Sequence, residues 1–346
     1  MTDIKSMNFE ELKEKLVAMG EKEFRAAQIY EWMHRKLCGG FDEMTNISIP
    51  LREKCKESFS FCTLRAVDRR ESVDGTCKFL FELPDKNVIE SVLMKYHHGN
   101  SVCISSQVGC RMGCAFCAST IGGLTRNLLP SEMLEQIYEI TKISGERVSN
   151  IVVMGTGEPF DNYDNLIRFL EMISDVRGLN ISGRNLTIST CGIVPRIKEF
   201  ADGGFTANLA LSLHAPNDAL RQKLMPVARA YPLTEILSAM DEYYQKTGRR
   251  LTFEYSLISG VNDSAAQARE LSSLIKGRNC LVNLIPVNEV KEREFKRSHA
   301  KNIENFKNIL EKNRINVTIR REMGSDIDAA CGQLRKSYMD KGVNRE

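Results

Sequence analysis

Seven short β-rich segments alternate with amphipathic segments between residues 101 and 321, and this alternation constrains the fold more than any other feature. The β-rich segments span residues 101–106, 150–155, 184–190, 207–215, 251–258, 280–287 and 316–321. The helical segments between them begin near Pro130, Tyr163, Val194, Pro232, Asp263 and Lys301. A repeated strand–helix unit predicts a parallel sheet with right-handed crossovers. Six units and a seventh strand are too few for an eight-stranded barrel, so we expect an α/β fold with an open, partial (βα)6 barrel.

The first 84 residues follow a different pattern, which predicts a small helical accessory domain. Apolar residues recur at helical spacing in residues 8–20 and 24–38, and a third helix is expected after Pro50. Three segments then alternate as strands do, at residues 61–70, 77–85 and 87–97. We therefore expect an N-terminal domain of residues 1–84, with linker strands, and a core of residues 85–346.

The composition is that of a soluble globular chain. Of the 346 residues, 42% are hydrophobic and 27% are charged, and no apolar run approaches the roughly 20 residues that span a bilayer. Eleven cysteines without a secretory signal indicate reduced thiols rather than a disulfide framework. We expect a cytoplasmic protein with no membrane attachment and, by default, a monomer.

The charge is unevenly distributed. Residues 291–346 hold 14 Lys and Arg against 9 Asp and Glu, although the whole chain has a net charge of only +3. A basic C-terminal segment can attract phosphates, but a solvated lysine-rich helix has the same composition. Charge alone therefore leaves nucleic-acid binding open.

Three cysteines follow the first strand of the repeat, in the sequence VGCRMGCAFCAST. Cys110, Cys114 and Cys117 are spaced C-x3-C-x2-C, in a loop at the strand end where such folds carry their chemistry. A closed zinc site needs a fourth ligand, and no second Cys or His pair follows at suitable spacing. A 4Fe-4S cubane held by three thiolates keeps one iron open, so the triad favours an iron–sulfur cluster that binds substrate.

The triad, with Phe116 before its last cysteine, resembles the signature of radical S-adenosylmethionine (SAM) enzymes. In that superfamily SAM chelates the fourth iron, and an electron from the cluster cleaves it to a 5′-deoxyadenosyl radical that abstracts a hydrogen atom. A closer likeness covers almost the whole chain. CISSQVGCRMGCAFCAST, RNL, MGTGEP, LSLHAPND and ACGQLR occur in this order in the RlmN family of rRNA and tRNA adenine methyltransferases.

The resemblance implies a SAM site at the strand ends. Gly157 and Glu158 match the GEP turn, where glycine permits close backbone approach and the carboxylate can pair with the SAM ammonium. Further SAM contacts are expected at Ser189, Ser212, Leu213, His214 and Asn288. The implied cofactors are one 4Fe-4S cluster and two SAM molecules per turnover.

The resemblance also implies the reaction, which forms 2-methyladenosine in 23S rRNA and at tRNA position 37, just 3′ of the anticodon. Cys331, in ACGQLR, matches the position that carries the methyl group as S-methylcysteine. Cys103 matches the resolving cysteine, which forms a transient disulfide with Cys331. Glu90 matches the proton acceptor, for which burial that raises the pKa would be useful. A flavodoxin- or ferredoxin-like protein is expected to donate electrons.

RNA contacts are expected from the basic tail and from Arg25, Arg35 and Lys36 in the N-terminal helices. The nearest alternative is a methyltransferase of the antibiotic-resistance type, which modifies carbon 8 of the adenine with the same cysteines. The longer N-terminal domain and Val108 in SSQVGC favour carbon 2. More distant alternatives are an activase that generates a glycyl radical, an iron–sulfur electron carrier and a zinc-stabilised RNA-binding module.

Overall fold

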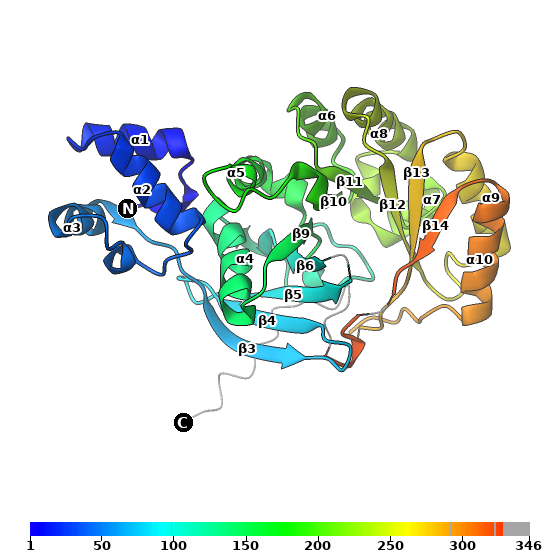
Figure 1. The fold of residues 1–346 in the computed structure, drawn as a ribbon. Helices are drawn as coiled ribbons and strands as arrows, with labels where there is room; N and C mark the ends of the chain where they lie inside the picture. The colour runs from blue at the N-terminus through cyan, green and yellow to red at the C-terminus, as the bar shows by residue number, and fades with distance from the viewer. Residues whose placement is uncertain (98, 291, 322, 328–346) are drawn as a thin grey trace.

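The computed structural model describes residues 1–97, 99–290, 292–321 and 323–327. One ten-stranded sheet forms its centre, in the order β14-β13-β12-β11-β10-β9-β6-β5-β4-β3 (Figure 1). The strands are β3 (Arg65–Glu71), β4 (Cys77–Glu82), β5 (Val88–Tyr96), β6 (Gly99–Ile104), β9 (Val148–Val153), β10 (Leu186–Thr190), β11 (Asn208–Ser212), β12 (Leu251–Leu257), β13 (Cys280–Pro286) and β14 (Asn316–Ile319). From β6 to β14 all neighbours are parallel. The sheet does not close, which confirms the α/β class and the partial barrel.

Helices follow six of the parallel strands and cover one face of the sheet (Figure 1). They are α4 (Pro130–Ser144), α5 (Tyr163–Ser174), α6 (Val194–Asp202), α8 (Leu233–Thr247), α9 (Ala265–Leu274) and α10 (Ala300–Lys312). Their apolar sides pack on outward strand residues such as Ile151, Leu211 and Phe253, which are fully buried in one large core. No helix among the described residues is long and apolar enough to span a membrane.

The opposite, inner face of the sheet is polar toward the carboxyl ends of its strands. Aligned residues on neighbouring strands point the same way, so the register places Cys103, Ser189, Ser212, Glu254 and Asn283 on this face. Direct contacts agree, because the Ser189 and Ser212 hydroxyls lie 3.3 Å apart and the Asn283 amide donates to the Glu254 carboxylate at 3.0 Å. The inner face therefore provides a polar lining for a ligand.

The N-terminal helices form a separate small core. Helices α1 (Phe9–Ala18), α2 (Phe24–His34) and α3 (Ile49–Ser58) bury residues such as Leu12, Ile29 and Cys55 against one another. Buried polar contacts join this unit to α4. Lys5 forms an ion pair with Glu135 at 2.6 Å, and the His34 ring contacts the Tyr138 hydroxyl at 2.8 Å.

The helical unit ends before the boundary expected from the sequence. We grouped residues 61–84 with the N-terminal domain as linker strands, but β3 and β4 pair antiparallel with each other and then with β5. They extend the main sheet because β4 is apolar and buries Phe79 and Phe81 in the large core. The helical unit therefore ends near residue 60, and the strands after it belong to the core.

Candidate active site

A short β-hairpin carries the three clustered cysteines. Strands β7 (Gln107–Gly109) and β8 (Leu124–Asn127) pair antiparallel, and residues 110–123 loop out between them. Gly109 has φ of +75°, and a Cβ there would lie 2.0 Å from the Gly123 carbonyl oxygen. Only glycine fits this close crossing, which fixes where the cysteine loop begins.

The three cysteines affect one another electrostatically, in partly buried surroundings that suit an iron–sulfur cluster. Burial raises the pKa of Cys110 to about 12 and raises the pKa of Cys114 further, with contributions from the neighbouring cysteines. Thiolates in such a place need a positive partner, which a metal cluster supplies, so this donor set fits one. Among the described residues no three His, Cys, Asp or Glu side chains surround a common point as metal ligands. The metal assignment therefore stays a prediction.

One cavity brings the cysteine loop and the strand ends together. Its empty space is about 980 Å³, which includes space open to solvent. All three clustered cysteines line it, as do Gly157, Glu158, Ser189, Ser212, His214 and Asn288. Leu213 does not line it, because its side chain is buried in the large core behind the sheet.

The GEP turn is held by its own backbone and by the cysteine hairpin. Gly157 has φ of +113°, and a Cβ there would lie 2.7 Å from Gln107 Cβ and from Ser106 Oγ. The Glu158 carboxylate accepts the backbone N–H of Phe160 at 3.0 Å and that of Cys191 at 2.8 Å. Burial raises the pKa of Glu158, and these N–H groups oppose the shift. The carboxylate thus ties the turn to the end of β10, and a role toward an ammonium group stays a prediction.

His214 is a neutral hydrogen-bonding group on the cavity wall. Burial lowers its pKa to about 3, with a smaller contribution from Arg221. The Ser256 N–H donates to His214 Nδ1 at 2.9 Å, so the neutral ring carries its proton on Nε2. The ring also packs edge-on against Phe116, with centroids 4.9 Å apart. His214 is therefore fixed in orientation beside the cysteine loop.

Two charged residues of the cavity were missed from the sequence. Glu254, in β12, and Arg320, just after β14, both line the cavity. Burial raises the pKa of Glu254, while Arg320 and the Asn283 amide oppose the shift. A lone glutamate in the apolar segment LTFEYSL was the available signal. For Arg320 the strand-ending pair Arg320-Arg321 gave no indication of which residue turns inward.

A second polar group lies beside the cavity, at the β4–β5–β6 side of the sheet. Glu90, which is 2% exposed, forms an ion pair with Lys78 at 2.8 Å. The register pairs Lys78 with Val92, and Val92 with Cys103, so all four side chains share the inner face. Glu90 and Cys103 do not line the cavity, but Met154 does, and Met154 packs in the same cluster as Cys103.

Polar contacts brace the cysteine hairpin at its base. The Gln107 side-chain amide donates to Asn127 at 2.8 Å and to Asp161 at 3.0 Å, and its Oε1 accepts the Glu158 backbone N–H at 2.9 Å. Arg111, next to the first cysteine of the triad, forms an ion pair with Asp161. The cysteine loop and the GEP turn are thus joined as one unit.

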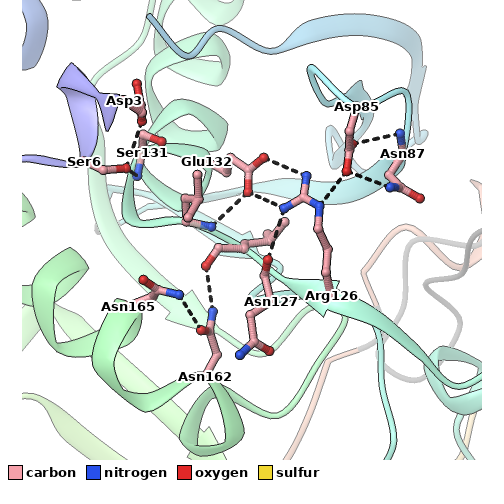
Figure 2. A network of polar contacts seen from close by, with 12 residues as sticks. Asp3, Ser6, Asp85, Asn87, Arg126, Asn127, Ser131, Glu132, Asn162 and Asn165 are labelled. Carbon is pink, nitrogen blue, oxygen red and sulfur yellow. Dashed lines mark hydrogen bonds and ion pairs between the residues drawn. The ribbon is translucent and has the colours of Figure 1, made fainter. Parts of the chain in front are cut away.

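Arg126 anchors the other strand of the hairpin. Figure 2 shows its guanidinium between Asp85, at 2.6 Å, and both carboxylate oxygens of Glu132, at 2.7 and 2.8 Å. Glu132 also accepts the backbone N–H of Leu129 at 2.9 Å, which fixes the start of α4. The RNL segment therefore has a structural role here, because it fastens β8 to the β4–β5 turn and to α4.

Cys331 lies outside the described residues, so its predicted role and its predicted transient disulfide with Cys103 stay predictions. No disulfide bond joins two of the ten cysteines that the structure describes.

Comparison with known proteins identifies two matching families. Residues 2–60 match the ribosomal RNA large subunit methyltransferase N-terminal domain, and residues 104–271 match the radical SAM superfamily. A probable dual-specificity RNA methyltransferase RlmN of Lachnoclostridium phytofermentans is 66% identical, over 99% of this chain and 97% of its own length. The protein of the same description from Geobacillus kaustophilus is 55% identical, over 97% of this chain and 93% of its own length.

A solved structure matches the whole fold. A radical SAM methyltransferase from Sphaerobacter thermophilus has a TM-score of 0.93 and 43% sequence identity, with 97% of this chain and 100% of that chain covered. The likeness thus includes the N-terminal helical unit as well as the partial barrel.

Proposed function

Because the chain belongs to the RlmN family of radical SAM RNA methyltransferases, we propose that it methylates carbon 2 of adenosine in 23S rRNA and in tRNA. The rRNA target is the adenosine at the peptidyl transferase centre, and the tRNA target is adenosine 37. The observation that carries the proposal is the single cavity lined by the three clustered cysteines and by the polar strand ends. The names of the relatives, which describe dual-specificity RNA methyltransferases, support two RNA substrates.

The cavity residues would hold one 4Fe-4S cluster and SAM. Cys110, Cys114 and Cys117 would bind the cluster, which supplies the electron that cleaves SAM when both are bound. Ser189, Ser212 and Asn288 offer hydrogen bonds, and the neutral His214 offers a donor at Nε2. The GEP turn offers a closely packed backbone at Gly157.

Two cysteines and a carboxylate would complete the transfer. Cys331 would carry the methyl group, and the methyl carbon would bond to carbon 2 of the adenine once the radical that SAM cleavage would supply has removed one hydrogen atom from it. Cys103 would then attack the sulfur of Cys331 and break its bond to the transferred carbon, with one electron returned to the cluster, so that the methylated RNA is released and a Cys103–Cys331 disulfide is left for reduction. Glu90, on the same sheet face as Cys103, would take the proton from carbon 2. Lys78 supports this role, because a cation 2.8 Å away favours the ionised carboxylate that a base requires.

The cytoplasm is the proposed location, since both RNA substrates occur there. The target base has to leave its stack to reach the cavity, as for other enzymes that act on a base atom. The N-terminal unit offers cationic and aromatic groups for RNA, because Arg25 stacks on Phe24 and Lys36 on Trp32. A flavodoxin- or ferredoxin-like donor and a monomeric enzyme complete the proposal.

Replacing Glu90 with glutamine should trap RNA on the enzyme. The amide keeps the size of the side chain but cannot accept the proton, and loss of a general base slows a step by about 10²–10⁴-fold. We expect a covalent RNA–protein adduct, measured by denaturing gel electrophoresis after reaction with SAM and reductant. Glu82→Gln is the matched control, since Glu82 forms surface ion pairs with Arg65 and Lys86 at the end of β4. Equal product release by the Glu90 and Glu82 variants would remove Glu90 from the reaction.

Mass spectrometry of the product tests the function itself. Anaerobically reconstituted protein, SAM and a low-potential reductant should convert a 23S rRNA fragment and a tRNA to species with one added methyl group on adenosine. Nucleoside fragmentation against 2-methyl and 8-methyl standards should place the group on carbon 2. Methyl on carbon 8 would instead identify the reaction of the resistance type.

A further inference from the structure

The turn between β3 and β4 grips a segment from the far end of the chain. The Asp326 carboxylate accepts the Ser72 hydroxyl at 2.6 Å and the Val73 N–H at 3.3 Å. In the opposite direction, the Gly324 N–H donates to the Asp74 carboxylate at 3.0 Å. Figure 1 shows the orange segment of residues 323–327 beside the tip of this hairpin. The two segments thus hold each other by three hydrogen bonds, all of which involve a carboxylate.

The turn is already shaped for this contact by its own hydrogen bonds. The Ser72 N–H donates to the Thr76 carbonyl at 2.8 Å, and the Thr76 N–H donates to the Asp74 carboxylate at 2.9 Å. Gly75 has φ of +83°, which a glycine accepts without strain. Burial alone would raise the pKa of Asp74, but hydrogen bonds from Thr76, Gly324 and Ser72 outweigh this effect and lower the pKa to about 2. Asp74 is therefore ionised at neutral pH, and its hydrogen bonds are charge-assisted.

The other side of residues 323–327 packs near Cys103, the predicted resolving cysteine. Met323 is buried in one cluster with Cys103, Val92 and Met94, and Ile327 packs on the same cluster. The segment therefore has a polar side fixed by the β3–β4 turn and an apolar side fixed near Cys103. It ends only four residues before Cys331 in the sequence.

This spacing limits where Cys331 can go. Cys331 is five residues beyond Asp326, and five residues of fully extended chain span at most about 18 Å, so hydrogen bonding of residues 324–326 limits how far Cys331 can lie from the cluster that contains Cys103. Without these hydrogen bonds, the segment that carries Cys331 would not be fixed to the β3–β4 turn, and its position relative to Cys103 would be less restricted. A tether that holds two groups together raises their effective concentration toward one another.

We propose that the β3–β4 turn is a latch that positions the Cys331 segment opposite Cys103. Asp74 and Asp326, with Ser72, are then positioning residues for both the methyl-carrying and the resolving step. The proposal rests on the proposed roles of Cys103 and Cys331.

Disulfide formation in the full-length apoprotein tests the latch without the cofactors. Diamide takes two electrons and two protons from a pair of thiols, and peptide mass spectrometry then gives the rate of Cys103–Cys331 linkage. We expect Asp326→Ala and Asp74→Ala each to slow this linkage by about three- to fivefold, the effect of losing the hydrogen bonds of a carboxylate that is partly exposed to solvent. Asp326→Asn, which keeps one acceptor oxygen, should fall between Asp326→Ala and the wild type.

Val73→Ala is the matched control, because the Val73 side chain is 97% exposed in the same turn and its N–H contact to Asp326 survives the substitution. Its linkage rate should equal that of the wild type. Thermal unfolding of every variant checks that the fold persists. Wild-type rates in Asp74→Ala and Asp326→Ala would overturn the latch alone. Absence of the Cys103–Cys331 linkage in the wild type would overturn the latch together with the proposed roles of the cysteines.

Discussion

Anaerobically reconstituted Cys114→Ala should hold far less than about four irons per chain and should not cleave SAM to 5′-deoxyadenosine. Substitution of a residue that supports a metal ligand typically lowers metal affinity or activity by about 10–100-fold. Loss of a ligand itself should have a larger effect and leave no measurable methylation. The reason is local, because Cys114 shares one loop with Cys110 and Cys117, and the remaining two thiols cannot hold a cubane that relies on three. Iron analysis and chromatography of the SAM products provide the measurements.

Cys280→Ala is the matched control for this result. Cys280 is also buried, but it begins β13 and thus lies at the end of the sheet opposite the cavity. Iron content and SAM cleavage should stay at wild-type levels in this variant. A Cys114→Ala protein that kept the wild-type iron content would show that the metal is held by other residues, and the assignment of the triad would be abandoned.

The barrel was predictable from the sequence because its signal is repeated and local. Each parallel strand is an apolar run buried on its helix side, and each helix begins within a few residues of its expected start, such as Pro130 for α4 and Val194 for α6. The strands β7 and β8 were not predicted. They are three and four residues long, and they are defined by the close crossing of Gly109 and Gly123, which no local pattern encodes.

The boundary at residue 84 was misplaced for a related reason. The strands at residues 65–71 and 77–82 were predicted, but their partners were not, because antiparallel strands next to a helical segment can belong to either unit. Pairing of β4 with β5 decides the question, and that pairing depends on the three-dimensional sheet.

The candidate site was likewise predictable from the sequence only in part. The cavity residues follow predicted strands at one edge of a parallel sheet, so topology alone brings Ser189, Ser212 and Asn288 together. The sequence also indicates the partner of Glu90. Lys78 and Glu90 are charged residues in apolar strands joined by a short turn, and a hairpin register sets them diagonally on one face. The latch had no such signal, since Ser72 and Asp326 are 254 residues apart.

Replacing Cys331 with alanine should abolish the product but leave cluster assembly and the cleavage of SAM to 5′-deoxyadenosine intact. Without a thiol at this position there is no acceptor for the methyl group, so neither S-methylcysteine nor methylated adenosine should form. Iron content should match the wild type, and slow cleavage of SAM to 5′-deoxyadenosine should persist, because the cavity that holds the cluster and SAM is built from residues 110–320. Peptide and nucleoside mass spectrometry measure both outcomes.

The cluster cysteines and Cys331 should therefore differ in which activities are lost when each is replaced. Cys114→Ala should lose iron, SAM cleavage and methylation together, whereas Cys331→Ala should lose methylation alone. Cys55→Ala, in the separate core of the N-terminal helices, should lose none of them. Methylated adenosine from the Cys331 variant would mean that the methyl group reaches the RNA without a protein carrier, and Cys103, Glu90 and the latch would then need another purpose. The prediction for Cys331 therefore tests why the inner face places a buried thiol and a buried ion pair side by side, next to the cavity rather than in it.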